Sequence, residues 1–130
     1  MRGQDFAGVC AIAILIATVV PALAETATEV QSWCRPMGSA QVLPDGRIRA
    51  GTKFEDGFCW GAFASMQELG NIVHDNEPLL LFCAPVGSTR VQWVQIFLKY
   101  TDQHPEQGQM AFGGVARRAL ADAFPCRPVR

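Results

Sequence analysis

The stretch that decides the fold runs from Phe82-Cys83-Ala84-Pro85 through His104-Pro105-Glu106 to Phe124-Pro125-Cys126. Between these three motifs lie two segments with apolar residues at helical spacing, and we expect helices over about 90–104 and 105–124. Pro105 disfavours helical backbone at His104 and suits the first turn of a following helix, so the connection is very short. Helices joined in this way pack antiparallel, which brings Cys83 beside Cys126.

The first of these helices has a clear start signal. Thr89 and Gln92 have the spacing of a capping box, in which each side chain accepts a hydrogen bond from the other residue's backbone N–H. The helix should be buried on more than one side, because its apolar positions cover more than one face: Val91, Trp93, Val94, Ile96, Phe97, Leu98, Tyr100 and Thr101. The second helix should bury Met110, Ala111, Val115, Ala119 and Leu120, and should contain the Gly113-Gly114 pair as a close contact or a kink.

The N-terminus is typical of a secretory signal peptide. Arg2 precedes an apolar run from Phe6 to Val20, and Ala22-Leu23-Ala24 is a small-residue cleavage motif. We expect cleavage after Ala24, with residues 1–24 as the signal peptide and 25–130 as a single domain. An uncleaved membrane anchor is the alternative. After cleavage we expect no stable association with the membrane, and the protein should be periplasmic.

Export to an oxidising compartment favours disulfide bonds between the cysteines. The mature chain holds four, Cys34, Cys59, Cys83 and Cys126, and an even count in an exported chain indicates disulfides rather than free thiols. Since the antiparallel helices pair Cys83 with Cys126, Cys34 is left for Cys59. Loop-closure entropy gives roughly 3.5 to 4 kcal/mol for each bridge. The spacing matches neither a thiol oxidoreductase nor a zinc site.

The N-terminal half supplies two more expected helices. Thr26 and Glu29 form a second possible capping box, and the helix that follows should end at Pro36 after docking Trp33 into the core. Another helix should run from Glu55-Asp56 to about Val73. Its buried face should be Phe58, Ala62, Met66, Leu69 and Val73, with Phe63 beside it and Cys59 one step off the main stripe. Gly57 and Gly61 should allow close packing on the first helix. The fold class is therefore all-α, a small four-helix domain with two disulfides.

Two connections contain turn signals. Residues 35–53 include Pro44-Asp45-Gly46; Val42-Leu43 could pair with Arg47-Ile48-Arg49 as a tiny hairpin, although an irregular surface loop is favoured. A polar turn at Asp75-Asn76-Glu77-Pro78 precedes Leu79-Leu80-Leu81-Phe82, which should enter the core in extended form. Trp60 lies near the edge of its helix stripe. Together with Arg47 and Arg49 it could form a protein-binding surface, and Asp75 is a further candidate contact.

The chemistry-bearing residues do not form a catalytic pattern. The two histidines, His74 and His104, lie at expected helix ends, where an exposed or capping role is ordinary. No nucleophile elbow, phosphate-binding loop or metal-ligand spacing occurs, so we expect no enzyme, no metal and no cofactor. The net charge is −1, without long runs of either sign, which argues against nucleic acid as the partner.

The same motifs resemble those of the Rap/Tai family, the small periplasmic immunity proteins of type VI secretion systems. The resemblance covers about 34–126 and rests on the order and separation of Phe82-Cys83-Ala84-Pro85, Thr89, Gln92, His104-Pro105-Glu106, Ala119-Leu120 and Phe124-Pro125-Cys126. In the helix that carries Cys59, this chain has alanine and serine where the family has a tyrosine and a second glycine.

The resemblance implies an inhibitor, not an enzyme: a helical, disulfide-linked protein that binds a cell-wall amidase effector and occludes its active-site cleft. Members are often dimers, so a homodimer is possible, and part of the occlusion comes from a protruding loop. The alternative function is that of a periplasmic acid-stress chaperone of the HdeA type, which would need exposure of apolar surface at low pH.

Overall fold

The fold is an all-helical domain with a two-stranded hairpin at one end. The structure is a computed structural model that describes residues 24–45, 47–49 and 51–126. The elements are α1 (Ala27–Gly38), α2 (Phe54–Gly70), β1 (Val73–His74), β2 (Glu77–Pro78), α3 (Arg90–Gln103), a 3-10 turn η1 (Pro105–Gln107) and α4 (Phe112–Ala123). This confirms the expected four-helix domain. Of the predicted signal peptide only Ala24 is among the described residues.

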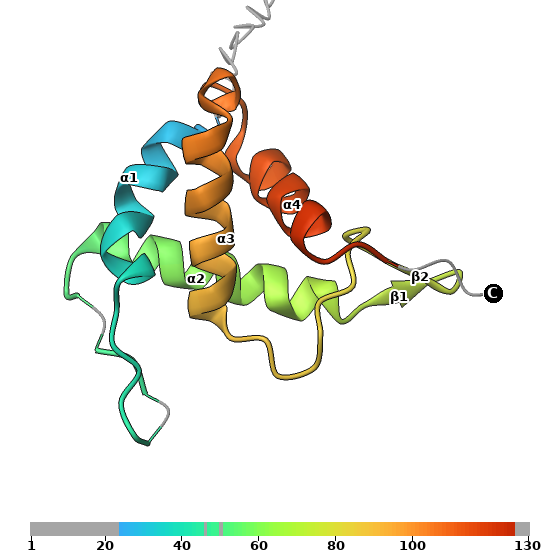
Figure 1. The fold of residues 1–130 in the computed structure, drawn as a ribbon, viewed down its shortest axis with the longest axis horizontal. Helices are drawn as coiled ribbons and strands as arrows, with labels where there is room; N and C mark the ends of the chain where they lie inside the picture. The colour runs from blue at the N-terminus through green and yellow to red at the C-terminus, as the bar shows by residue number, and fades with distance from the viewer. Residues whose placement is uncertain (1–23, 46, 50, 127–130) are drawn as a thin grey trace, which may run out of the picture.

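Helix α3 is central, because it packs against each of the other three helices (Figure 1). It begins after Thr89 and ends before His104, as its capping box and Pro105 predict. Its buried residues cover more than one face, which also confirms the prediction: Val91, Trp93, Val94, Phe97, Tyr100 and Thr101. Around it the core is aromatic, with Phe63, Phe97 and Phe112 in mutual contact, and Trp93 packed between Phe82 and Phe124.

The two disulfides are those predicted. Cys83 and Cys126 join the segment before α3 to the end of α4, and the backbone N–H of Cys83 donates to the carbonyl of Phe124 at 2.8 Å. Cys34 of α1 joins Cys59 of α2, and both of these residues are fully buried. One bridge therefore lies at the surface and the other in the core.

The helix expected from Pro105 begins later, at Phe112. Pro105 starts only the 3-10 turn, and residues 108–111 run beside the start of α1 instead of coiling. The N–H groups of Ala27 and Thr28, which have no partner within α1, donate to the carbonyls of Met110 and Gly108. This tertiary pairing outweighs the local helix signal.

Residues near the start of α4 were also placed wrongly. Met110, expected in the core, is 44% exposed. Gly113 and Gly114 lie in the first turn of α4, facing open space, so they make neither the close contact nor the kink that we expected.

Helix α1 continues past Pro36, which was predicted to end it. Pro36 is exposed and lies in the last turn, so its missing N–H removes one backbone hydrogen bond close to the end of α1 rather than interrupting the helix interior. The extra turn buries Met37 and lets the Gln95 side chain of α3 donate to the Gly38 carbonyl at 2.9 Å. Trp33 is only half-buried and packs edge-on against Phe58.

The buried face of helix α2 is turned from the predicted one, although Met66, and Phe63 beside the predicted face, are buried as expected. Its buried residues are Asp56, Cys59, Phe63 and Met66, while Leu69 is 41% exposed and Val73 lies beyond the helix in β1. The bridge to Cys34 turns Cys59 inward and carries Phe58 to the side. Gly57 and Gly61 face open space, so α2 packs on α1 without help from either glycine.

Candidate protein-binding surfaces

The four residues predicted to contact a partner do not form one site. Arg47 and Arg49 lie on the long connection between α1 and α2, whereas Asp75 lies at the tip of the β1–β2 hairpin. Figure 1 places these two segments at opposite ends of the domain. Trp60 lies between them in the sequence, on α2. The structure therefore offers separate surfaces, each of which needs its own description.

The first surface is the arm, residues 40–53, of which the structure describes 40–45, 47–49 and 51–53. It extends away from the helices (Figure 1). Val42 and Ile48 form an antiparallel bridge, and the Leu43 N–H donates to the Arg47 carbonyl at 2.7 Å. The tiny hairpin, the alternative that the sequence disfavoured, is thus the observed state. It forms because Asp45 stabilises the turn.

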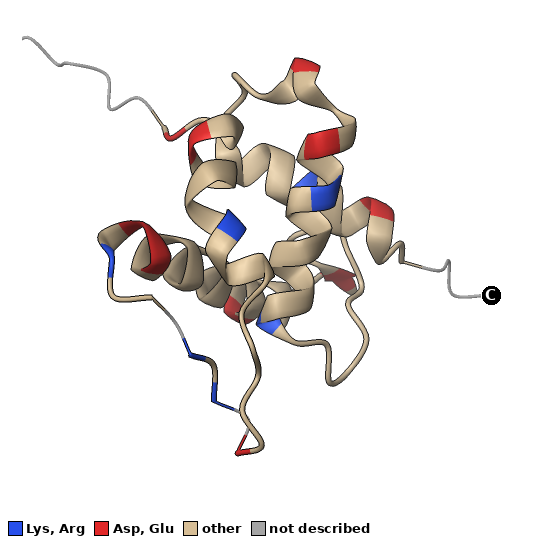
Figure 2. Ribbon diagram, turned by 60° about the vertical axis from the view of Figure 1, so that its left-hand side comes forward, with Lys and Arg blue, Asp and Glu red and all other residues tan. Residues whose placement is uncertain are grey.

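Asp45 acts through its carboxylate. The Arg47 backbone N–H donates to it at 3.0 Å and the Arg47 guanidinium lies 2.6 Å from it. These two hydrogen bonds lower the pKa of Asp45 below its ordinary value, and the bond from the Arg47 backbone makes the larger contribution. The Arg47 side chain remains 80% exposed. Figure 2 shows that the basic residues of this region lie along the arm.

The base of the arm is held against α2. Asp56 of α2 is buried, and its carboxylate accepts a hydrogen bond from the Lys53 N–H at 3.3 Å. Gly51 passes so close that a Cβ there would collide with this carboxylate. The glycine is therefore needed for the close approach of the arm to α2.

Trp60 is less available than the sequence suggested. Its ring is half-buried, and the Arg90 guanidinium of α3 lies 4.2 Å from the ring centroid, a cation–π contact. The same Arg90 donates to the Gln67 side chain at 2.9 Å. A partner would meet Trp60 and Arg90 together rather than an open aromatic ring.

The second surface is the hairpin that carries Asp75. Residues 75 and 76 have φ values of 50° and 66°, the left-handed pair that a two-residue turn requires and that Asp and Asn tolerate. The strands pair Val73 with Pro78 and His74 with Glu77. The run 79–82 enters the core only in part: Phe82 is buried and Leu80 packs against the core, whereas Leu79 and Leu81 are 48% and 56% exposed.

A hollow lies beside this turn. It measures about 410 Å³ and is lined by His74, Asp75, Glu77, Pro78, Leu79 and Leu81. The Asp75 side chain is 88% exposed and lies 3.2 Å from the ring of His74. Sequence reasoning found Asp75 but missed the leucines. The feature of the sequence that could have pointed to this surface is its charge pattern, since no lysine or arginine occurs between Lys53 and Arg90.

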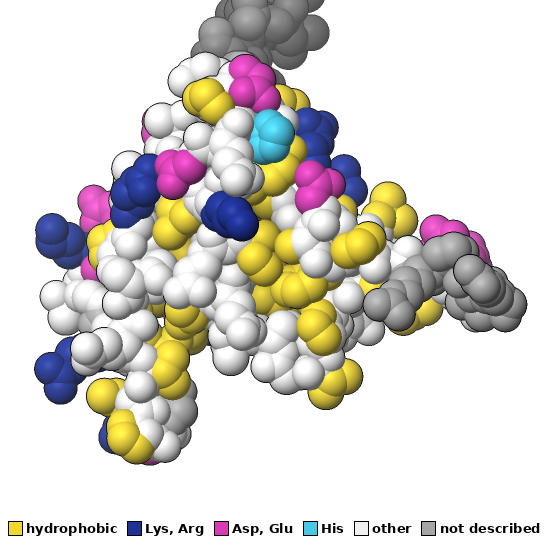
Figure 3. Space-filling model, in the orientation of Figure 1, with side chains coloured by type: hydrophobic (Ala, Val, Ile, Leu, Met, Phe, Trp, Pro, Cys, Tyr) yellow, Lys and Arg dark blue, Asp and Glu magenta, His cyan; other side chains and the backbone are white. Residues whose placement is uncertain are grey.

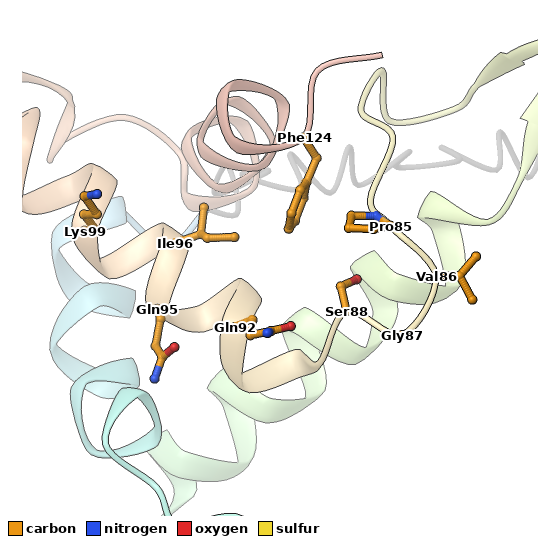
Figure 4. A pocket seen from close by; sticks show the side chains of 9 residues that line it. All are labelled: Pro85, Val86, Gly87, Ser88, Gln92, Gln95, Ile96, Lys99 and Phe124. Carbon is orange, nitrogen blue, oxygen red and sulfur yellow. The ribbon is translucent and has the colours of Figure 1, made fainter. Parts of the chain in front are cut away.

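A third surface is a groove along α3. It has a volume of about 520 Å³ and is bounded by the 85–88 loop, one side of α3 and Phe124 (Figure 4). Phe124 and Ile96 point into it, while Gln92 and Lys99 supply polar groups on the α3 side. Figure 3 shows apolar side chains continuing down this face of the domain. No periodicity argument predicted this groove, because Ile96 and Phe124 had been assigned to helix packing and punctuation.

The described residues carry no group of three or more histidine, cysteine, aspartate or glutamate side chains that could hold a metal ion. Two carboxylates besides Asp45 have pKa values below their ordinary range, and both have local structural causes. Glu29 accepts from the Thr26 hydroxyl and backbone in the α1 capping box, and Glu106 accepts from its own backbone N–H and from His104. No helix in the described part of the chain is long and apolar enough to cross a membrane.

Comparison with known proteins adds one decisive finding. The profile of the family described as Rap1a immunity proteins matches residues 26–126, from the α1 cap to the last half-cystine. Neither a curated protein nor a solved structure matches the chain. The family match covers both disulfides and all four helices, and it agrees with the resemblance of the motifs. This chain belongs to the Rap1a immunity protein family.

Proposed function

We propose that this protein is a periplasmic immunity protein that binds a peptidoglycan amidase delivered by type VI secretion and occludes its active site. The observation that carries the proposal is the family match over the whole helical domain. The two disulfides support export, because such bonds form after a chain leaves the reducing cytoplasm. In this proposal residues 1–24 are the signal peptide, cleaved after Ala24, and 25–130 are the mature domain.

Inhibition by occlusion needs surfaces that contact the toxin, and we assign this role to the arm and the hairpin. The arm presents the exposed side chains of Val42, Arg47 and Arg49 well away from the helices, on a base held by Asp56. Asp75 at the hairpin and the Trp60–Arg90 pair are the remaining contacts that we propose. The enzyme is blocked without any chemistry on the inhibitor. Dimerisation of the inhibitor is part of the proposal.

The experiment is co-expression with a type VI peptidoglycan amidase, taken from beside this gene if one is encoded there. The amidase is exported to the periplasm of a test strain, and lysis is followed with three versions of the inhibitor: the full chain, the chain without residues 1–24, and none. We expect rescue by the full chain alone. The purified proteins should form a stable complex on gel filtration. Lysis that proceeds equally with the full chain, together with absence of a complex, would refute the proposal.

Charge reversal on the arm provides a matched control. The double variant R47E/R49E reverses the charge of the two exposed arginines of the arm, while R117E/R118E makes the same charge change on α4. If the arm contacts the toxin, the first variant should lose protection and the second should keep it. Gel filtration and circular dichroism verify that both variants fold. Equal protection by the two variants would remove the arm from the contact surface.

A further inference from the structure

The hairpin is the most apolar exposed region of the described chain. Residues 69–81 contribute five of its exposed large apolar side chains: Leu69, Ile72, Val73, Leu79 and Leu81. A small domain seldom exposes so many within one short segment unless something binds there. Leu81 adds a further sign, since its φ of 57° lies in the left-handed region that a leucine avoids. Such strain is typical of functional positions.

The charges of this region have a single sign. Between Lys53 and Arg90 the chain carries five acidic residues and neither lysine nor arginine, and two of these acids, Asp75 and Glu77, line the hollow. Besides these acids and His74, the lining of the hollow is apolar, with Pro78, Leu79 and Leu81. This combination suits a side chain that has an apolar stem and a cationic head.

We propose that the hairpin hollow receives an arginine or lysine side chain from the toxin. The alkyl stem packs on Leu79 and Leu81, and the cationic head reaches the carboxylates of Asp75 and Glu77, which accept its hydrogen bonds. The proposal rests on the proposed function, because it names a contact in that complex. It adds the chemistry of the toxin surface at this point, which is a basic residue surrounded by apolar ones. The basic arm, by contrast, would contact acidic residues.

Two variants test the hollow without disturbing the fold. Leu81→Asn removes one of the two leucines that line the hollow and places at a positive φ a residue that tolerates this conformation, so the domain should be at least as stable as the wild type. Affinity for the toxin should nevertheless fall about tenfold. D75N/E77Q keeps the shape and removes both charges, and it should slow association about fivefold at low salt, with a smaller effect at high salt. Stability and affinity therefore move independently.

The measurement is surface plasmon resonance with the amidase used in the co-expression experiment, at two salt concentrations, alongside thermal unfolding. Met110→Ser and Asp122→Asn are the controls, since they alter an exposed apolar and an exposed acidic residue away from the hairpin. Wild-type affinity in both hairpin variants overturns this inference and leaves the proposed function standing. If the wild-type chain itself fails to bind, the proposed function is wrong and this contact is wrong with it. If light scattering shows that the hairpin variants alter only self-association, the hollow contacts a second copy and the inference is wrong.

Discussion

Removing the Cys34–Cys59 bridge should destabilise the domain more than removing Cys83–Cys126, although it closes the shorter loop. The bridges span 25 and 43 residues. Loop-closure entropy alone gives about 3.5 kcal/mol for the first and about 4.0 kcal/mol for the second. The order of the two stability losses reverses once the burial of the sulfur atoms is included. Cys34 and Cys59 have no exposed surface, so changing both to alanine deletes two buried sulfur atoms and leaves a cavity.

Each deleted buried atom of this size costs about 1 kcal/mol, so C34A/C59A should lose roughly 5.5 kcal/mol. Both residues of the other pair are exposed, so C83A/C126A leaves no cavity and should lose only the entropic ~4 kcal/mol. A difference of about 1.5 kcal/mol corresponds to roughly 6–10 °C in Tm for a domain of this size.

The assay is urea and thermal unfolding of the mature domain, followed by far-UV circular dichroism. Double alanine variants are used because a single substitution would leave a reactive thiol. A lower stability of C83A/C126A than of C34A/C59A would refute the reasoning, because loop length would then outweigh burial.

Three further predictions concern local structure. Thr89→Ala removes the α3 cap and should cost about 1 kcal/mol in urea unfolding; an unchanged midpoint would show that tertiary packing alone starts the helix. Gly51→Ala should destabilise the domain because its Cβ meets the Asp56 carboxylate, whereas Gly57→Ala, in open space on α2, should stabilise it by roughly 0.5–1 kcal/mol. Because the folded-state pKa of Glu29 is lowered, its contribution is present above the unfolded carboxyl pKa and is lost as pH falls through the folded value; urea midpoints of Glu29→Ala should therefore converge with the wild type in acid, and a constant gap would contradict this.

The acid-stress alternative has its own test. An HdeA-type chaperone would suppress client aggregation at about pH 2 to 3, where model carboxyl groups are protonated. We expect the mature domain to leave aggregation unchanged both at that pH and at neutral pH, in a light-scattering assay with a client enzyme. Suppression confined to acid would favour the chaperone function over immunity.

Helix α3 could be predicted from the sequence because its signals are local. Thr89, Gln92 and Pro105 act on backbone within a few residues of themselves, and no tertiary contact is needed to interpret them. The two disulfides followed from the same signals, since an antiparallel pair of helices leaves few choices for the ends. The late start of α4 does not change the cysteine pairing, because the chain reverses direction after His104 as predicted.

The face of α2 could not be predicted in the same way. Its apolar residues lie on several sides, so periodicity does not select a single stripe. What selects it is the bond from Cys59 to Cys34, a tertiary constraint that turns Phe63 inward and leaves Leu69 exposed. The continuation of α1 past Pro36 has a similar cause, because the burial of Met37 is a contact with the rest of the domain.

The sequence predicted which residue types could contact a partner, but not how these residues are arranged in space. The sequence identified Arg47, Arg49 and Asp75 as exposed charges near turns. It did not indicate that the turn at Asp75 carries Leu79 and Leu81 to the same hollow, because this depends on positive φ values at three non-glycine residues. Likewise, the contact of the Arg90 guanidinium with the Trp60 ring joins two helices, and no local sequence pattern predicts it.

The position of the disulfides lets the arm and the hairpin accept changes of side chain without loss of the fold. The arm lies inside the loop that Cys34 and Cys59 close, and the hairpin lies between Cys59 and Cys83, so a half-cystine anchors each segment at both ends. A change of side chain at the tip of either segment then leaves the ends fixed and the core untouched, and it costs little stability. An inhibitor that must match a particular toxin needs surfaces with this freedom. In this domain the disulfides and the proposed contact residues are separate parts of the chain, and we propose that specificity resides in the exposed residues of the arm and hairpin.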